Sequence, residues 1–181
     1  MAHISVPPDI PGIRSLALFR PETGDPLYAL VQVLLRGPSP LSFAQRELIA
    51  AYVSSLNRCK FCTDSHAAAA RTLFGEQGVL VSGVLENVGT SMIDPKMKRL
   101  LGIAEKVQES GKAVLPQDID LARKEGATDR ELHDTVLIAA TFCMFNRYVD
   151  GLDTWTPTDA KMYDGMGKRL ATKGYILNKK S

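Results

Sequence analysis

The stretch Leu56–His66, LNRCKFCTDSH, decides the fold, because it turns one predicted helix back onto the next. Helical spacing of apolar residues runs through residues 42–57 and resumes through residues 59–74. We expect Asn57 to end the first helix in the left-handed conformation, a common way for a helix to stop. The two helices then lie antiparallel and side by side.

Two cysteines and a histidine in this stretch share one face of the second helix. Cys59 and Cys62 are three positions apart and Cys62 and His66 are four apart, the spacings of helical neighbours. Residues three apart bring their Cα atoms to roughly 5 Å, inside the range that a disulfide needs. The dipole at a helix start lowers the pKa of a thiol from about 8.5 to roughly 7 at best. The pattern predicts a dithiol–disulfide pair, with His66 as the proton acceptor for Cys62.

Glu47 is expected to meet His66 across the turn. Glu47 lies ten positions before Asn57 and His66 lies nine after it, so in antiparallel helices the two fall at the same height. A carboxylate beside an imidazole orients the ring and stabilises its charged form. Glu47, His66 and Cys62 are therefore predicted to form a proton relay that ends on a sulfur.

The rest of the chain is also predicted to be helical. Asp94 and Pro95 open one helix as N-cap and first residue, and Thr128 with Glu131 forms a capping box for another. The long apolar helix over residues 128–151 is predicted to be the central one. No segment shows the alternating pattern of a β-strand, so the fold class is all-α.

The first 26 residues are predicted to be an extended or irregular arm. They hold five prolines, each of which lacks an amide donor and disfavours helix at the residue before it; these are Pro7, Pro8, Pro11, Pro21 and Pro26. The expected organisation is an arm over residues 1–26 and a single helical domain over residues 27–181.

Composition narrows the class of protein. The 181 residues are 45% hydrophobic and 23% charged, which suits one globular domain. The net charge is only +2 and no basic, aromatic-interleaved stripe occurs, so we expect no nucleic-acid partner. No apolar run is long enough to span a bilayer, and the first residues do not resemble a secretory signal. We therefore expect a cytoplasmic protein without a membrane partner. Three cysteines do not suggest a structural disulfide framework.

The spaced pattern E-x11-C-x-x-C-x3-H, carried by Glu47, Cys59, Cys62 and His66, resembles a known family. It is similar to that of the alkylhydroperoxidase D / carboxymuconolactone decarboxylase family, and more specifically to its peroxidase-related branch. The downstream DREL.DTVLIAATFCMFNRYVDGL is similar to the closing helix of that branch. The resemblance covers roughly residues 25 to 155.

The resemblance implies an alkylhydroperoxidase D-like fold of antiparallel helical hairpins that assembles into homotrimers or homohexamers. It implies a CxxC-dependent thiol peroxidase or disulfide reductase that needs no metal or other cofactor, and a peroxidase of this kind is reset by an external thiol or dithiol. It assigns Cys62 as the cysteine that attacks the peroxide, Cys59 as the resolving cysteine, and Glu47 and His66 as the relay. The sequence departs from the best-studied members at Phe61, where they have a histidine, and this departure bears on the strength of the activity and on the reductant.

Other interpretations of the same residues stay open. Cys59 and Cys62 can be packed thiols, or they can bind zinc with His66 and Glu47, although a structural zinc site needs four ligands. A non-catalytic redox sensor or adaptor would form the disulfide without turning over peroxide. A lactone decarboxylase-like lyase would use Glu47 and His66 as acid and base and would not need the cysteines. Cys143, in the apolar run of its helix, is expected to be a core thiol.

Overall fold

The structure is a computed structural model and describes residues 2–176 of the chain. Every regular element in this range is a helix, so the prediction of an all-α fold is confirmed for the described residues. Along the chain the elements are α1 (Ile13–Phe19), α2 (Pro21–Arg36), α3 (Phe43–Leu56), α4 (Lys60–Phe74), the 3-10 turn η1 (Gly75–Gly78), α5 (Val79–Glu86), α6 (Pro95–Glu109), the 3-10 turn η2 (Gly111–Ala113), α7 (Pro116–Lys124), α8 (Asp129–Gly151) and α9 (Ala160–Lys173).

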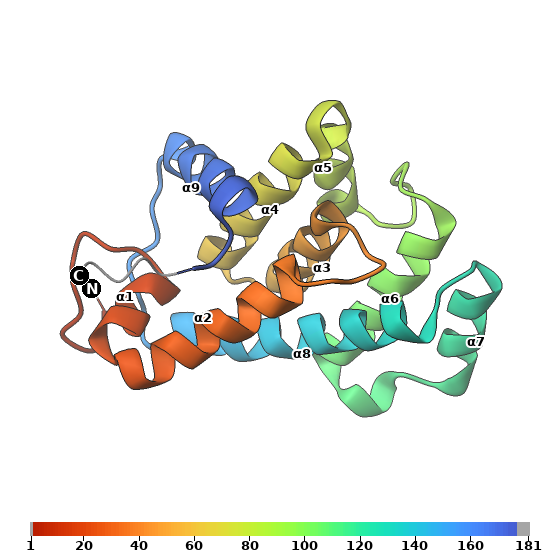
Figure 1. The fold of residues 1–181 in the computed structure, drawn as a ribbon, viewed down its shortest axis with the longest axis horizontal. Helices are drawn as coiled ribbons and strands as arrows, with labels where there is room; N and C mark the ends of the chain where they lie inside the picture. The colour runs from red at the N-terminus through yellow and green to blue at the C-terminus, as the bar shows by residue number, and fades with distance from the viewer. Residues whose placement is uncertain (1, 177–181) are drawn as a thin grey trace.

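Helix α3 is the central element. It packs against α2, α4, α5, α6 and α8, and its residues 46–54 are all buried. Helix α8 keeps one exposed face, so the prediction that it is the central helix is wrong. The apolar run of α8 suggested a central position because the helix is long and one of its faces borders the core over most of its length. Figure 1 shows α6 and α7 at the opposite end of the molecule from α1.

The turn between α3 and α4 differs in detail from the prediction. Asn57 is right-handed at φ −75°, and the left-handed residue is Arg58 at φ 61°. The Asn57 side chain donates to Asn146 Oδ1 at 2.8 Å and accepts from Gln108 at 2.9 Å, which ties the turn to α8 and α6. Cys59 is the N-cap of α4, so the helix begins at Lys60. The strain of a left-handed residue with a side chain, about 1–2 kcal/mol, therefore falls on Arg58.

The expected extended arm is wrong for much of its length. Residues 13–19 form α1, and α2 begins at Pro21 and continues through Pro26, so the expected boundary at residue 26 falls inside a helix. Pro21 suits the first helical position, where its missing amide costs nothing. Helix α2 passes through Pro26 because tertiary packing holds it: a Cβ on Gly24 would lie 2.6 Å from Ala17 Cα of α1.

Residues 2–12 are irregular, as predicted, and lie over the body of the molecule. The amides of His3 and Gly12 donate to the carbonyls of Leu152 and Trp155 at 2.9 and 3.0 Å. The N-terminal segment is thus bound to the connection between α8 and α9. The division into an arm and one domain stays a prediction, and residues 1 and 177–181 of those ranges lie outside the described part of the chain.

Close packing of α9 on α4 brings the C-terminal segment to the centre of the molecule (Figure 1). A Cβ on Gly167 would lie 2.6 Å from the backbone carbon of Ala68, so only glycine allows this approach. After α9, Gly174 takes φ 64° and turns the chain inward. Tyr175 is buried as a result.

The predicted helix caps are present. Ser42 and Gln45 form a reciprocal capping box on α3, and Thr128 and Glu131 form one on α8. Asp94 accepts from the amide of Met97 at the start of α6. Within residues 2–176, no helix combines the length and the apolar character that crossing a membrane requires.

Candidate active site

Glu47 of α3 and His66 of α4 are in contact, as the sequence predicted. The ring nitrogen Nδ1 of His66 lies 2.6 Å from Glu47 Oε2. Glu47 is fully buried and His66 is nearly so, at 0% and 9% exposure. Antiparallel packing of two straight helices across a tight turn is enough to produce this meeting, because each residue rises by the same 1.5 Å or so along its helix.

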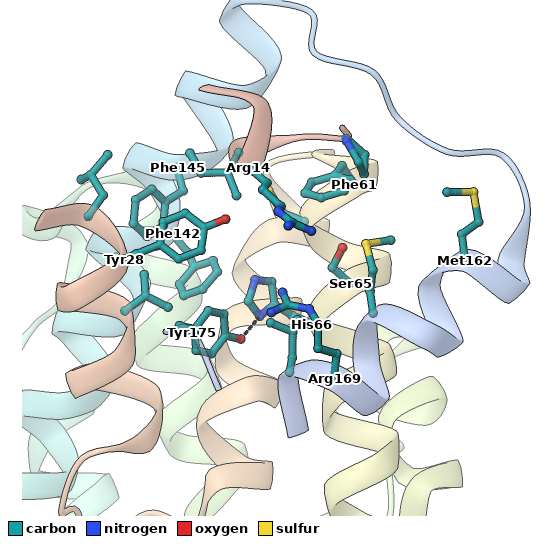
Figure 2. Close-up of a pocket in the computed structure, with 17 residues that line it drawn as sticks. Arg14, Tyr28, Phe61, Ser65, His66, Phe142, Phe145, Met162, Arg169 and Tyr175 are labelled. Atoms are coloured by element: carbon teal, nitrogen blue, oxygen red, sulfur yellow. Dashed lines mark hydrogen bonds between the residues drawn. The ribbon is translucent and has the colours of Figure 1, made fainter. Parts of the chain in front are cut away.

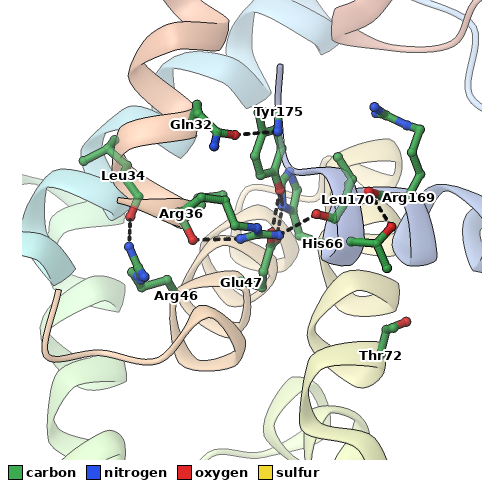
Figure 3. Close-up of polar contacts among 12 residues, drawn as sticks. Gln32, Leu34, Arg36, Arg46, Glu47, His66, Thr72, Arg169, Leu170 and Tyr175 are labelled. Carbon is green, nitrogen blue, oxygen red and sulfur yellow. Dashed lines mark hydrogen bonds and ion pairs between the residues drawn. The ribbon is translucent and has the colours of Figure 1, made fainter. Parts of the chain in front are cut away.

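Two further residues bind the other oxygen of the carboxylate (Figure 3). Arg36 Nη2 from the end of α2 donates to Glu47 Oε1 at 2.5 Å, and Tyr175 Oη donates to the same oxygen at 2.6 Å. Arg36 also donates to the carbonyl of Leu170 at 3.0 Å, which ties α2 to α9. The Tyr175 ring stacks on His66 at a centroid distance of 6.0 Å.

These partners keep Glu47 ionised despite its burial. Burial acts to raise the pKa of Glu47, but the charge and hydrogen bond of His66, the charge of Arg36 and the hydrogen bond of Tyr175 outweigh it and hold the pKa below its ordinary value. A carboxylate accepts hydrogen bonds and cannot donate one, so the His66 proton lies on Nδ1. Nε2 is then the basic nitrogen of the ring.

A cavity of about 210 Å³ opens beside this cluster (Figure 2). His66 and Cys62 from α4 share its wall with residues of α1, α2, α8 and α9. It is smaller than the pockets of roughly 300–1,000 Å³ that hold drug-sized ligands. The cavity therefore suits a small organic molecule placed directly against His66 and Cys62.

Cys59 and Cys62 are both free thiols in the structure and lie next to each other. The pKa of Cys59 is raised far above its ordinary value, first by a hydrogen bond with Cys62, then by burial and by the charge of Cys62. Cys59 thus keeps its proton. Only Cys62 lines the cavity, although the two are about equally buried, at 4% exposure for Cys62 and 0% for Cys59. The geometry makes Cys62 the sulfur that a ligand can reach.

The predicted last link of the relay is not a direct bond. Within the described residues, His66 forms no hydrogen bond with Cys62, although both line the cavity. A proton that passes between them must travel through a water molecule or a ligand in the cavity. The predicted relay would therefore include the cavity between the two residues.

Phe61, at the position of departure, is a packing residue. It is buried, lines the cavity and packs against Tyr163 of α9 at a ring-centroid distance of 6.3 Å. A Cβ on Gly12 would lie 2.0 Å from its ring, so the N-terminal segment is pressed onto it. Here the side chain between the cysteines closes the cavity and carries no titratable group.

Two other predictions concerned a zinc site and the role of Cys143. Within residues 2–176, no three or more His, Cys, Asp or Glu side chains are arranged to hold a metal ion, so the geometry does not favour the zinc interpretation. Cys143 is half-buried against the main core, where Asn57 Nδ2 lies 3.5 Å from its sulfur. It does not line the cavity.

Sequence reasoning missed Arg36 and Tyr175. A charged residue at the end of the apolar stripe of α2 was a weak sign that Arg36 is buried with a partner, since lone buried charges are costly. Nothing local to Tyr175 marks it, because its partner Glu47 is 128 positions away. The arginines of the cavity, Arg14 and Arg169, were likewise hidden in separate helices.

The chain was then compared with known proteins. Residues 21–76 match the carboxymuconolactone decarboxylase family. The match covers less than half of the chain, so it is a similarity of this segment to that family. The segment contains α2, α3 and α4, and with them Arg36, the Glu47–His66 pair, Cys59 and the cavity residue Cys62. The resemblance found in the sequence is confirmed. A search of curated proteins found no match.

Two solved structures extend the similarity from residues 21–76 to most of the chain. One is an alkylhydroperoxidase AhpD core, an uncharacterized peroxidase-related protein from Ralstonia eutropha JMP134, with 24% identity and a TM-score of 0.78 over 88% of this chain and 82% of that one. The other is an uncharacterized peroxidase-related protein from Silicibacter sp. TM1040, with 27% identity and a TM-score of 0.75 over 87% and 81%. The fold is therefore alkylhydroperoxidase D-like.

Proposed function

We propose that the protein is a thiol peroxidase that reduces organic hydroperoxides through a disulfide between Cys59 and Cys62. The observation that carries this proposal is that Cys62, beside a protonated Cys59, lines the same small cavity as His66. A peroxide in the cavity meets a sulfur nucleophile and a basic nitrogen together. The peroxidase-related solved structures and the family match support the same class of activity.

The chemistry begins with removal of the Cys62 proton. Nε2 of His66 accepts it, through a water molecule or the bound peroxide, and the Glu47 carboxylate stabilises the imidazolium that forms. The Cys62 thiolate attacks the outer peroxide oxygen, the O–O bond breaks, and Cys62 becomes a sulfenic acid. The leaving alkoxide takes the proton back from His66 and departs as an alcohol.

Cys59 then closes the disulfide. Its thiol attacks the Cys62 sulfur, and its proton leaves with the sulfenic hydroxyl as water. An external dithiol attacks Cys62, the sulfur that lines the cavity, releases Cys59 as a thiol, and completes the exchange through a mixed disulfide. Over one cycle the hydroperoxide and the dithiol become an alcohol, water and a disulfide.

The proposal includes an assembly and a location. By resemblance, the protein forms a homotrimer or homohexamer in the cytoplasm. Exposed apolar side chains on α2, such as Val33 at 66% exposure, are compatible with a subunit contact there. Light scattering on the purified protein measures the subunit number, and a monomer would contradict this part of the proposal.

The test is hydroperoxide consumption with dithiothreitol as electron donor. We expect Cys62→Ser to abolish turnover, Cys59→Ser to leave a sulfenic acid that dimedone traps, and Cys143→Ser to retain the wild-type rate. Cys143 is the matched control because it is a thiol of the same chain that does not line the cavity. Equal rates for wild type and Cys62→Ser would refute the peroxidase.

A lyase on a lactone-like substrate is the second candidate. The buried Glu47–His66 pair facing the cavity favours it, because a carboxylate–imidazole pair can move protons without sulfur. It predicts turnover of a lactone acid that survives substitution of both cysteines. Reversible disulfide formation without turnover of either substrate would instead indicate a redox sensor.

A further inference from the structure

The cavity carries positive charge that the proposed mechanism does not use. Arg14 of α1 and Arg169 of α9 line it, and none of its lining residues is Asp or Glu. Neither guanidinium forms a hydrogen bond or ion pair with another described residue, in contrast to Arg36, which binds Glu47. Figure 2 shows both side chains turned toward the middle of the cavity, from opposite sides. Two unpaired cations at the mouth of an apolar cavity indicate an anionic ligand.

The charges of Arg14 and Arg169 both act on the hydroxyl of Tyr28, another residue of the cavity wall. Burial raises the pKa of Tyr28 to about 12, and the charges of Arg169 and Arg14 both act in the opposite direction on this one hydroxyl. The charge of Cys62 acts on it as well. The Tyr28 hydroxyl therefore lies within the electrostatic range of both arginines and of the reactive sulfur.

A buried hydroxyl without a partner adds a second kind of site. Ser65 lies between Cys62 and His66 on α4, lines the cavity and is 4% exposed, yet its Oγ has no hydrogen-bond partner in the structure. An unpaired buried hydroxyl costs about 1–3 kcal/mol, so a polar ligand atom beside it is favoured. The oxygens of a hydroperoxide held against Cys62 would supply such an atom.

The remainder of the lining is apolar. The aliphatic, aromatic and thioether side chains include Leu27, Val31, Phe142, Phe145, Met166 and Leu170. They favour a short hydrocarbon body between the two polar regions. The ligand then has three parts: a peroxide, an apolar chain and an anionic group.

From these features we propose that the substrate is a short organic hydroperoxide with a carboxylate, which Arg14 and Arg169 bind. This inference rests on the proposed peroxidase function and names the substrate class of that same site. Guanidinium groups bind carboxylates through paired, charge-assisted hydrogen bonds, which fixes the orientation of the chain. The arginines are specificity residues, and Cys62 and His66 remain the reacting groups.

The test compares 6-hydroperoxyhexanoic acid with its methyl ester. In the wild type we expect kcat/KM to be about 10- to 100-fold higher for the acid, which corresponds to ~1.4–2.8 kcal/mol. Arg169→Met and Arg14→Met should each reduce this acid-to-ester ratio, by about tenfold for Arg169→Met, whose side chain is the more buried. Lys168→Met is the matched control, because it removes the same charge from the neighbouring position of α9 outside the cavity lining, and it should keep the wild-type ratio.

The outcomes separate this inference from the proposed function. Equal kcat/KM for acid and ester in an active wild type would overturn the carboxylate site and leave the peroxidase standing. Loss of both activities in equal proportion in Arg169→Met would show that the guanidinium acts on the Cys62 sulfur, which also overturns it. If the wild type consumes neither compound, the proposed peroxidase function is wrong. Calorimetry with hexanoate and hexanol then tests the carboxylate site by itself, and hexanoate that binds no more tightly than hexanol would overturn that site as well.

Discussion

Replacing Arg36 by methionine removes one of the partners that keep a buried carboxylate charged. In the structure, Arg36 donates to Glu47 at 2.5 Å and its side chain is only 6% exposed, while that of Glu47 is 0% exposed. Methionine fills similar space without charge. The variant leaves Glu47 with the hydrogen bonds of Tyr175 and His66 and with the charge of Arg46, which also acts on the carboxylate.

Breaking one side of a buried ion pair typically costs about 3–5 kcal/mol. Because His66 still faces the carboxylate, we expect the low end, about 3 kcal/mol. At ~2–4 °C per kcal/mol for a domain of this size, this lowers Tm by about 6–12 °C. Urea unfolding at pH 7 and at one protein concentration measures the loss in the free energy of unfolding. The exposed Arg99→Met is the control for the loss of a positive charge.

Two results would refute the reasoning. The double variant Arg36→Met, Glu47→Gln should regain at least half of the lost stability, because the carboxylate that lost its Arg36 partner is then replaced by a neutral amide. If Arg36→Met lies within about 1 kcal/mol of the Arg99→Met control, or if the double variant equals the sum of the two single variants, the buried pair is not what stabilises this region.

The pH dependence of the same variant has a definite sign. The pKa of Glu47 in the folded protein is below its ordinary value of 4.5, so its ionisation stabilises the fold above that value and this contribution is lost as the pH falls through the folded pKa. Removing Arg36 removes one cause of the lowering and raises the folded pKa. The stability difference between wild type and Arg36→Met should therefore be largest at neutral pH and shrink below about pH 4.5.

Three further predictions concern the site and its supports. Tyr175→Phe removes a hydrogen bond that lowers the pKa of the buried Glu47 carboxylate, so the acidic limb of the pH–rate profile should move to higher pH. The free energy of unfolding should fall by about 1.5–3 kcal/mol. An acidic limb that does not move would contradict the coupling between Tyr175 and Glu47. Gly167→Ala should lower Tm, because its Cβ would lie 2.6 Å from the backbone of α4 and overpacking costs about 1–3 kcal/mol, whereas Gly165→Ala, with open space around it, should raise Tm slightly. Iodoacetamide should label Cys62 before Cys59 in peptide mass spectrometry, since Cys59 holds its proton and does not line the cavity; faster labelling of Cys59 would reverse the proposed roles.

Much of the site could be predicted from the sequence because its central contact is local. Glu47 and His66 lie on adjacent helices at matched distances from one turn, so helical rise alone sets them opposite each other. The caps at Ser42, Asp94 and Thr128 follow from neighbouring residues in the same way. The position of the left-handed residue could not be predicted, because the Asn57 side chain is engaged by α6 and α8.

The sequence by itself determined most of the helices after residue 26, the CxxC pair at the start of one of them and the meeting of Glu47 with His66, since each depends on spacing within about twenty residues. Only the tertiary structure decided what surrounds them. Tyr175 and Arg36 reach Glu47 because α9 packs closely on α4 and because Arg36, at the end of α2, binds the Leu170 carbonyl of α9. Arg14 of α1 and Arg169 of α9 line one cavity although they lie far apart in the sequence. Contacts between residues more than a hundred positions apart depend on how helices pack, and packing is set by whole surfaces such as the one around Gly167.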